Sequence, residues 1–243
     1  MRKLILWIAG VILSVSGFSQ VTADIGIWGG ASGYTGDIQG SNLTPNTLPA
    51  IGAYFRYNFH QRISARLMFL TGKVAMEGEF QNYPWKFDKA VQDLSLQGEV
   101  NYLKYMLGNR KASFTTYVTA GLGVMYFKYY LKPDEILLFN PRHNKGVEDA
   151  EQSAMALTLP VGMGFKFNVG KRLGLGMEYQ LRKIFDDRLD DLDDPLAHYN
   201  QQGDEVTYTD FLHNNDWIGY LGVHLTYKIY LGSKPCPAYD IKN

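Results

Sequence analysis

The stretch that decides the fold is residues 155–167, Met-Ala-Leu-Thr-Leu-Pro-Val-Gly-Met-Gly-Phe-Lys-Phe. Its odd positions are all Met, Leu, Val or Phe, whereas its even positions hold Ala, Thr, Pro, Gly and Lys. Successive side chains of a strand point to opposite faces, so this alternation predicts a strand with one apolar face and one face of small and polar residues. The same alternation continues over residues 173–182 and 217–229, which predicts further strands of the same kind.

Short turns and long polar segments alternate along the chain. The turn signals lie at residues 58–61, 108–111 and 169–172, and the long polar segments lie at residues 35–47, 77–88, 131–151 and 186–215. Eight strands are expected, near residues 21–33, 49–59, 61–75, 90–106, 112–129, 153–168, 172–185 and 216–230. This alternation is typical of outer-membrane barrels, with short turns in the periplasm and long loops outside the cell. An even number of strands places both chain ends in the periplasm.

The faces of the strands differ in charge, and this difference predicts which face meets lipid. One face carries glycines, Tyr, Thr and charges of both signs, namely Arg56, Arg66, Glu99, Lys166, Glu178 and Arg182. The other face carries almost no charge, as a lipid-facing surface requires, because Arg or Lys at mid-bilayer costs about 2–4 kcal/mol. Lys104 is the exception, and its place near a periplasmic turn would let it snorkel. We therefore expect an all-β fold, an eight-stranded antiparallel transmembrane β-barrel with short periplasmic turns and long extracellular loops. Side chains fill so narrow a barrel, so a conducting pore is not expected.

The N-terminus has the features of a secretory signal peptide. Met1-Arg2-Lys3 is basic, residues 4–14 are apolar but too few to span a bilayer as a helix, and cleavage is expected between Ser19 and Gln20. The expected organisation is a signal peptide over residues 1–19, an outer-membrane barrel over 20–232 and a periplasmic tail over 233–243. The formal net charge of zero gives no support for a nucleic-acid partner.

Candidate chemical sites are weak. The five histidines (His60, His143, His198, His213 and His224) have no metal-ligand spacing, and there is no Gly-x-Ser-x-Gly motif. The glycine pairs lie inside expected strands and precede no helix, which argues against a nucleotide loop. The acidic run over residues 186–194 lacks the EF-hand pattern, so a solvated loop is favoured over a calcium site. We expect no catalytic residue, no cofactor and no metal.

Partner contacts are expected on the periplasmic side. Cys236, the only cysteine, follows the last expected strand within a tail that also contains Pro235, Pro237 and Tyr239. An unpaired thiol in an oxidising compartment suggests intermolecular pairing, so we expect this tail to dock a partner, with a disulfide through Cys236 as the covalent form; an inert thiol is the alternative. Basic residues of the turns could meet acidic partner surfaces or could simply be solvated. They are Arg110, Lys111, Lys171 and Arg172.

Five segments together carry a family likeness. They are residues 29–37 (GGASGYTGD), 54–58 (YFRYN), 94–102 (LSLQGEVNY), 120–124 (AGLGV) and 181–191 (LRKIFDDRLDD). In order and spacing they resemble the PorG-like barrels of the type IX secretion system of Bacteroidota. The resemblance implies a barrel in the outer membrane of a Gram-negative envelope, associated with a periplasmic ring of the PorK lipoprotein and PorN. It also implies a role in the export of proteins with a C-terminal signal, and in some species in gliding. It carries no catalytic residues over.

The function expected from these observations is therefore a non-enzymatic barrel that contacts outer-membrane lipid and, through its turns and tail, the periplasmic ring. Two other classes remain open. A barrel enzyme acting on lipid or peptide would need a His, Ser and acid within hydrogen-bond reach. An adhesion or ligand-binding barrel would use the long outer loops, and deleting residues 186–215 would then abolish binding but not secretion.

Overall fold

The structure is a computed structural model, and it describes part of the chain. The described residues are 22–35, 47–80, 83–108, 112–130, 151–186, 188–189, 191, 198–199, 205–206 and 216–230. The expected signal peptide and the expected tail therefore lie outside the described residues. Within them, no helix is long and apolar enough to cross a membrane.

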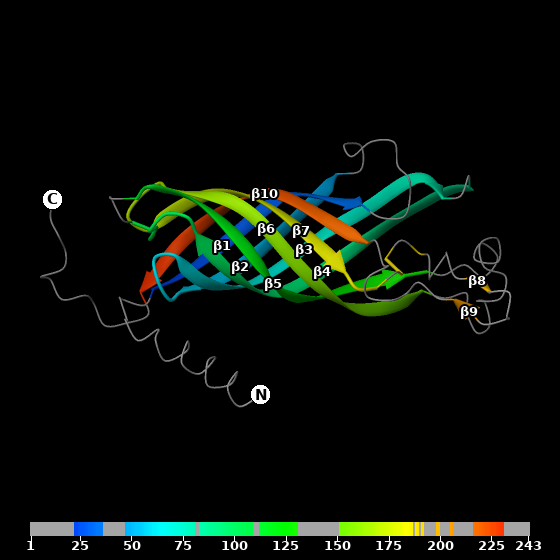
Figure 1. Ribbon diagram of the computed structural model, residues 1–243. Helices are drawn as coiled ribbons and strands as arrows, with labels where there is room; N and C mark the ends of the chain where they lie inside the picture. The colour runs from blue at the N-terminus through cyan, green and yellow to red at the C-terminus, as the bar shows by residue number, and fades with distance from the viewer. Residues whose placement is uncertain are drawn as a thin grey trace, which may run out of the picture.

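Eight long antiparallel strands close into a barrel, as predicted (Figure 1). They are β1 (Thr22–Thr35), β2 (Leu48–Asn58), β3 (Ile63–Phe80), β4 (Tyr83–Asn101), β5 (Phe114–Tyr129), β6 (Gln152–Asn168), β7 (Leu173–Ile184) and β10 (Trp217–Tyr230). Each strand pairs with its neighbours in the order β1-β10-β7-β6-β5-β4-β3-β2, and β2 pairs with β1 to complete the ring. Two short strands, β8 (His198–Tyr199) and β9 (Glu205–Val206), form a separate ribbon in the segment expected to be a loop.

The register defines two ends of the barrel. Thr22 pairs with Tyr230 where the barrel begins and finishes, and we call this the terminal end. The connections at the terminal end are residues 59–62, 102–113 and 169–172; those at the opposite, or far, end are residues 36–47, 81–82, 130–151 and 185–216. The predicted turns near residues 58–61 and 169–172 are therefore confirmed at the terminal end.

The prediction of a loop over residues 77–88 is wrong, because most of this segment is strand. β3 and β4 pair continuously from Ile63 with Val100 to Phe80 with Tyr83, and residues 81–82 alone join them. β2 stops pairing with β3 at Gly72, so the hairpin continues beyond its neighbour and projects at the far end (Figure 1). The charged residues of this segment suggested a loop, but charged side chains can also lie on the surface of an exposed hairpin. Here Lys86 Nζ lies 3.0 Å from Glu77 Oε2, in an exposed ion pair.

The tight turn expected at residues 108–111 is also wrong. β4 ends at Asn101, so the connection spans residues 102–113 and Lys104 lies outside the strand rather than on its lipid-facing side. Tyr105 and Leu107 are buried in this connection, and Lys228 Nζ donates to the Leu107 carbonyl at 2.8 Å. Gly108 has a φ of 84°, and a Cβ there would lie 2.2 Å from the Lys171 carbonyl oxygen. Residues 105–108 therefore lie over the terminal end, where Tyr105 and Leu107 gain burial without strand pairing.

Candidate functional site

The outer wall of the barrel is an apolar belt. The outward-facing odd positions of β6 are all exposed, from Met155 at 73% to Phe167 at 47%, which confirms the predicted direction of the two faces. Among described strand residues, exposed charged side chains occur only towards the far end, at Lys73, Glu77, Lys86, Asp88 and Lys128. At about 3.4 Å per residue and a tilt of about 40°, the segment from Met155 to Phe167 rises about 30 Å along the barrel axis.

Aromatic side chains mark the terminal edge of this belt. Those with exposed rings are Phe59, Tyr102, Phe114, Phe167 and Tyr227. Towards the far end, the Lys183 ammonium lies 5.2 Å from the ring of Trp217, which begins β10. The belt thus has an aromatic boundary at the terminal end and charged residues at the far end.

The barrel interior is filled by ion pairs in its terminal half. Glu99 lies between two cations, because Arg56 Nη1 contacts its carboxylate at 3.3 Å and Lys166 Nζ donates to its other oxygen. Arg56 Nε also donates to Asp24 at 3.0 Å, and Lys166 Nζ donates to Asn101 at 3.0 Å. All of these side chains are buried. Every charge in this group therefore has an opposite partner, as a buried charge requires.

A second group of polar side chains crosses the middle of the interior. Arg66 donates to Glu178 through both terminal nitrogens, at 2.7 and 2.8 Å, and Tyr117 donates to the same carboxylate at 2.5 Å. His224 lies between two tyrosines, 3.0 Å from the Tyr54 hydroxyl and 3.1 Å from the Tyr117 hydroxyl. His224 is 1% exposed. A ring so enclosed is part of the packing of the interior.

A third group lies nearer the far end and is followed by apolar packing. Arg182 Nη1 donates to Asp93 at 2.5 Å, Thr158 donates to Asp93 at 2.9 Å, and the Arg182 guanidinium lies 5.1 Å from the centre of the Tyr220 ring. Beyond this group the interior is mainly apolar, although Lys89 and Asp216 are also buried towards the far end. The buried apolar side chains include Leu70, Val74, Met125, Phe127 and Ile184. Side chains therefore fill the interior along the length of the barrel, as predicted.

The start of the acidic run closes the far mouth, where a solvated loop was expected. Leu189 is fully buried and belongs to the interior apolar cluster. Lys89 Nζ contacts Asp191 Oδ1 at 2.6 Å and donates to the Arg188 carbonyl at 3.1 Å. The hydrogen bonds of Asp186 raise the pKa of the Arg188 guanidinium above its ordinary value. The prediction of a solvated loop was wrong for these residues because it rested on the carboxylates and did not consider Leu189 between them. Asp187, Asp190 and residues 192–194 lie outside the described residues.

A family model now places the chain among known sequences. The model, a domain of unknown function (DUF6089), matches residues 2–240. The chain belongs to this family. The DUF6089 domain therefore includes the whole barrel from Thr22 to Tyr230.

Solved barrels with a similar outline have very different sequences. Ail of Yersinia pestis, solved with the heparin analogue sucrose octasulfate, is 13% identical to the DUF6089 chain, with 87% of this chain and 100% of Ail covered and a TM-score of 0.48. Neisserial surface protein A is 11% identical, with 87% and 98% covered and a TM-score of 0.47. OprG from Pseudomonas aeruginosa is 12% identical, with 87% and 98% covered and a TM-score of 0.43. Comparison with curated proteins gave no match.

The predicted partner-binding residues of the DUF6089 chain are described only in part. Lys171 and Arg172 are exposed in the turn at residues 169–172. Arg172 Nη1 donates to the Tyr227 hydroxyl at 3.3 Å, which directs its guanidinium to the outer wall. The other members lie outside the described residues: Arg110, Lys111, Pro235, Cys236, Pro237 and Tyr239.

Two further cations lie at the terminal end of the DUF6089 barrel, beside those expected to meet a partner. Arg62 and Lys104 are exposed there, and the three terminal-end connections contain no Asp or Glu. Sequence reasoning did not count Arg62 and Lys104 among the partner contacts, because it placed both residues inside strands. The terminal end is therefore a basic rim, which we define as Arg62, Lys104 and Lys171 among the described residues.

The remaining histidines of the DUF6089 chain are described only in part. His60 is exposed in the turn at residues 59–62, His198 lies in β8, and His143 and His213 lie outside the described residues. No group of three or more His, Cys, Asp or Glu side chains that could hold a metal ion occurs within the described part of the chain.

Proposed function

We propose that the chain is a non-enzymatic outer-membrane barrel that anchors a periplasmic assembly. The observation that carries the membrane location is the belt, which is apolar on every strand and uncharged between its aromatic edge and its far end. Its rise of about 30 Å suffices to cross the apolar band of outer-membrane barrels, which is about 25 Å tall. A water-soluble barrel would expose its polar face instead, since large exposed apolar patches mark interaction surfaces.

The proposed orientation places the terminal end in the periplasm. The first and last residues of the barrel strands, Thr22 and Tyr230, pair at the terminal end. Outer-membrane barrels have their shorter turns on the periplasmic side. The projecting β3–β4 hairpin then lies outside the cell. The basic rim faces the periplasm in this orientation.

A closed interior predicts the absence of ion conduction. Ion pairs occupy the terminal half, and Leu107 and Leu189 are buried near the two mouths. We expect the purified full chain to insert into planar bilayers without raising the current above the baseline, while a porin inserted in the same way gives stepwise conductance. Insertion is checked separately by flotation of the vesicles. Reproducible single-channel steps from the wild-type chain would contradict the closed interior.

The assembly we propose is the type IX secretion ring of the PorK lipoprotein and PorN. The support is the resemblance of five segments to PorG-like barrels, together with the basic rim. Several residues of those segments build the barrel itself: Arg56, Glu99 and Arg182 form interior ion pairs, and Leu189 closes the far mouth. The resemblance thus rests on residues that shape the barrel, and we assign the partner contact to the rim and the tail.

The partner proposal is tested by crosslinking in native envelopes followed by pull-down and mass spectrometry. We expect the ring lipoprotein among the captured proteins. Lys104→Glu with Lys171→Glu should lower its recovery about tenfold or more, because like charges juxtaposed at an interface cost several kcal/mol. Lys86→Glu, at the far end, is the matched control. Cys236→Ala should remove any adduct that is seen on non-reducing gels; if wild type captures no ring lipoprotein, the assignment to this system is wrong.

A further inference from the structure

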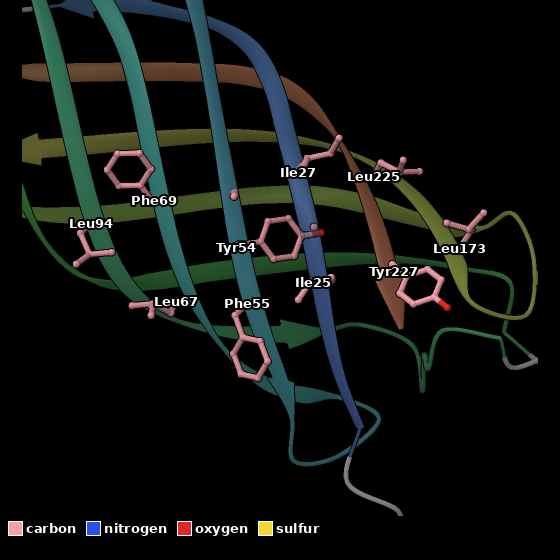
Figure 2. A pocket seen from close by; sticks show the side chains of 12 residues that line it. Ile25, Ile27, Tyr54, Phe55, Leu67, Phe69, Leu94, Leu173, Leu225 and Tyr227 are labelled. Atoms are coloured by element: carbon pink, nitrogen blue, oxygen red, sulfur yellow. The ribbon is translucent and has the colours of Figure 1, made fainter. Parts of the chain in front are cut away.

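The outer wall has an apolar groove of about 560 Å³, lined by residues of β1, β2, β3, β4, β7 and β10. Figure 2 shows the large side chains around it, with Tyr227 at the end of β10 on one side and Phe69 on the other. Every residue that lines the groove is apolar apart from its two tyrosines. The groove is therefore a depression within the belt rather than a polar cleft.

A single small residue creates this depression. Ala53 pairs with Ile27 on one neighbouring strand and with Phe69 on the other, and Phe55 follows on the same face of β2. All three neighbours are exposed and large, so the methyl group of Ala53 leaves a hollow among them. At Gly26 a Cβ would lie 2.2 Å from Tyr54 Cζ, which shows that the Tyr54 ring closes the wall from the inside.

A cation stands at the terminal end of the groove. Tyr227 lines the groove, and its hydroxyl accepts a hydrogen bond from Arg172 Nη1 at 3.3 Å. Arg172 and the adjacent Lys171 are both exposed in the turn that precedes Leu173, itself a lining residue. An apolar groove thus runs to a guanidinium at the aromatic edge of the belt, the level at which lipid headgroups meet water.

We propose that this groove binds one anionic glycerophospholipid of the inner leaflet, with an acyl chain over Ala53 and the phosphate on Arg172. The apolar lining of the groove suits the acyl chain of the lipid. The charge of Arg172 suits the phosphate, since guanidinium and phosphate form strong charge-assisted hydrogen bonds. Neither half would select such a lipid alone. The inference rests on the membrane location proposed above.

The test uses the full chain in nanodiscs of phosphatidylethanolamine with a minor fraction of phosphatidylglycerol, followed by stepwise delipidation and native mass spectrometry. The wild type is expected to retain one phosphatidylglycerol after the bulk lipid has been removed. Arg172→Gln should weaken retention about tenfold, the size expected for one hydrogen bond to a charged group. Ala53→Trp, which fills the groove, should abolish it. Lys86→Gln, at an exposed pair at the far end, should change nothing.

The outcomes separate this inference from the membrane location. Equal retention by wild type, Arg172→Gln and Ala53→Trp would overturn the lipid site while the barrel remained inserted. Displacement of the lipid by inorganic phosphate would overturn the role of the acyl chain. If an acidic protein bound through Arg172 and its binding were unchanged by Ala53→Trp, the occupant would be that protein rather than a lipid. A chain that stays monodisperse without detergent would overturn the membrane location itself.

Discussion

Replacing Arg66 by leucine is expected to lower the free energy of unfolding by about 3–5 kcal/mol, because it leaves a buried charge without its partner. Arg66 and Glu178 are both fully buried, and two hydrogen bonds of 2.7 and 2.8 Å join them. Tyr117 would remain on the carboxylate of Glu178. Gln180 Nε2 also donates to this carboxylate. Neutral donors cannot replace the charge of the guanidinium, so the carboxylate would be left without a counter-charge inside the barrel.

The measurement is equilibrium unfolding in denaturant of the barrel refolded in detergent micelles. Lys86→Leu removes a cation from the exposed pair with Glu77 and is the matched control, for which we expect a loss below about 1 kcal/mol. The double variant Arg66→Leu with Glu178→Leu should recover most of the stability, since removing both partners removes the orphaned charge. If Arg66→Leu were as mild as Lys86→Leu, water would have to reach the middle of the interior.

The alternation of residues 155–167 was enough to predict the two faces of the barrel. A period of two assigns every side chain to one face once a single residue is placed, so Lys166 and Phe167 could be assigned together. The charges of the second face then identified it as the interior, and Arg56, Arg66 and Glu178 are buried there. This part of the fold is a local property of each strand, which is why the sequence contains it.

The ends of the barrel could not be predicted in this way. The sequence predicted that the fourth strand runs to residue 106, but β4 ends at Asn101, and Tyr105 and Leu107 are buried because they cover the terminal end. Leu189 closes the far mouth from within an acidic run. In each case a side chain gains burial from the closed shape of the barrel, and that shape exists only after all eight strands have paired.

The candidate sites depend on register in the same way. Arg66 and Glu178 lie on β3 and β7, which are not neighbours in the barrel, so no local pattern could pair them. The groove arises because Ala53 lies between Ile27 and Phe69 across three strands. Individually, these residues are ordinary members of an apolar face. Only the register brings the small residue and its large neighbours into one row.

Replacing Leu96 by arginine is expected to impair membrane insertion and to lower the stability of the inserted barrel by about 2–4 kcal/mol, the cost of a cation at mid-bilayer. Leu96 is 62% exposed on β4 and lies in an apolar row between Leu67 and Leu122. Its side chain points away from the interior, so the substitution leaves the buried ion pairs intact. The added charge would lie far from either edge of the belt, where snorkelling to water is hardest.

Folding into vesicles, followed by protease protection and urea titration, measures this cost. Phe59→Arg is the matched control, because it places the same charge on a 46% exposed apolar residue in the terminal-end turn, where about 0–1 kcal/mol is expected. The difference between the two variants isolates depth in the membrane from the chemical change. If both variants inserted as well as the wild type, the belt would not be in contact with acyl chains, because only hydrocarbon distinguishes the two positions this strongly.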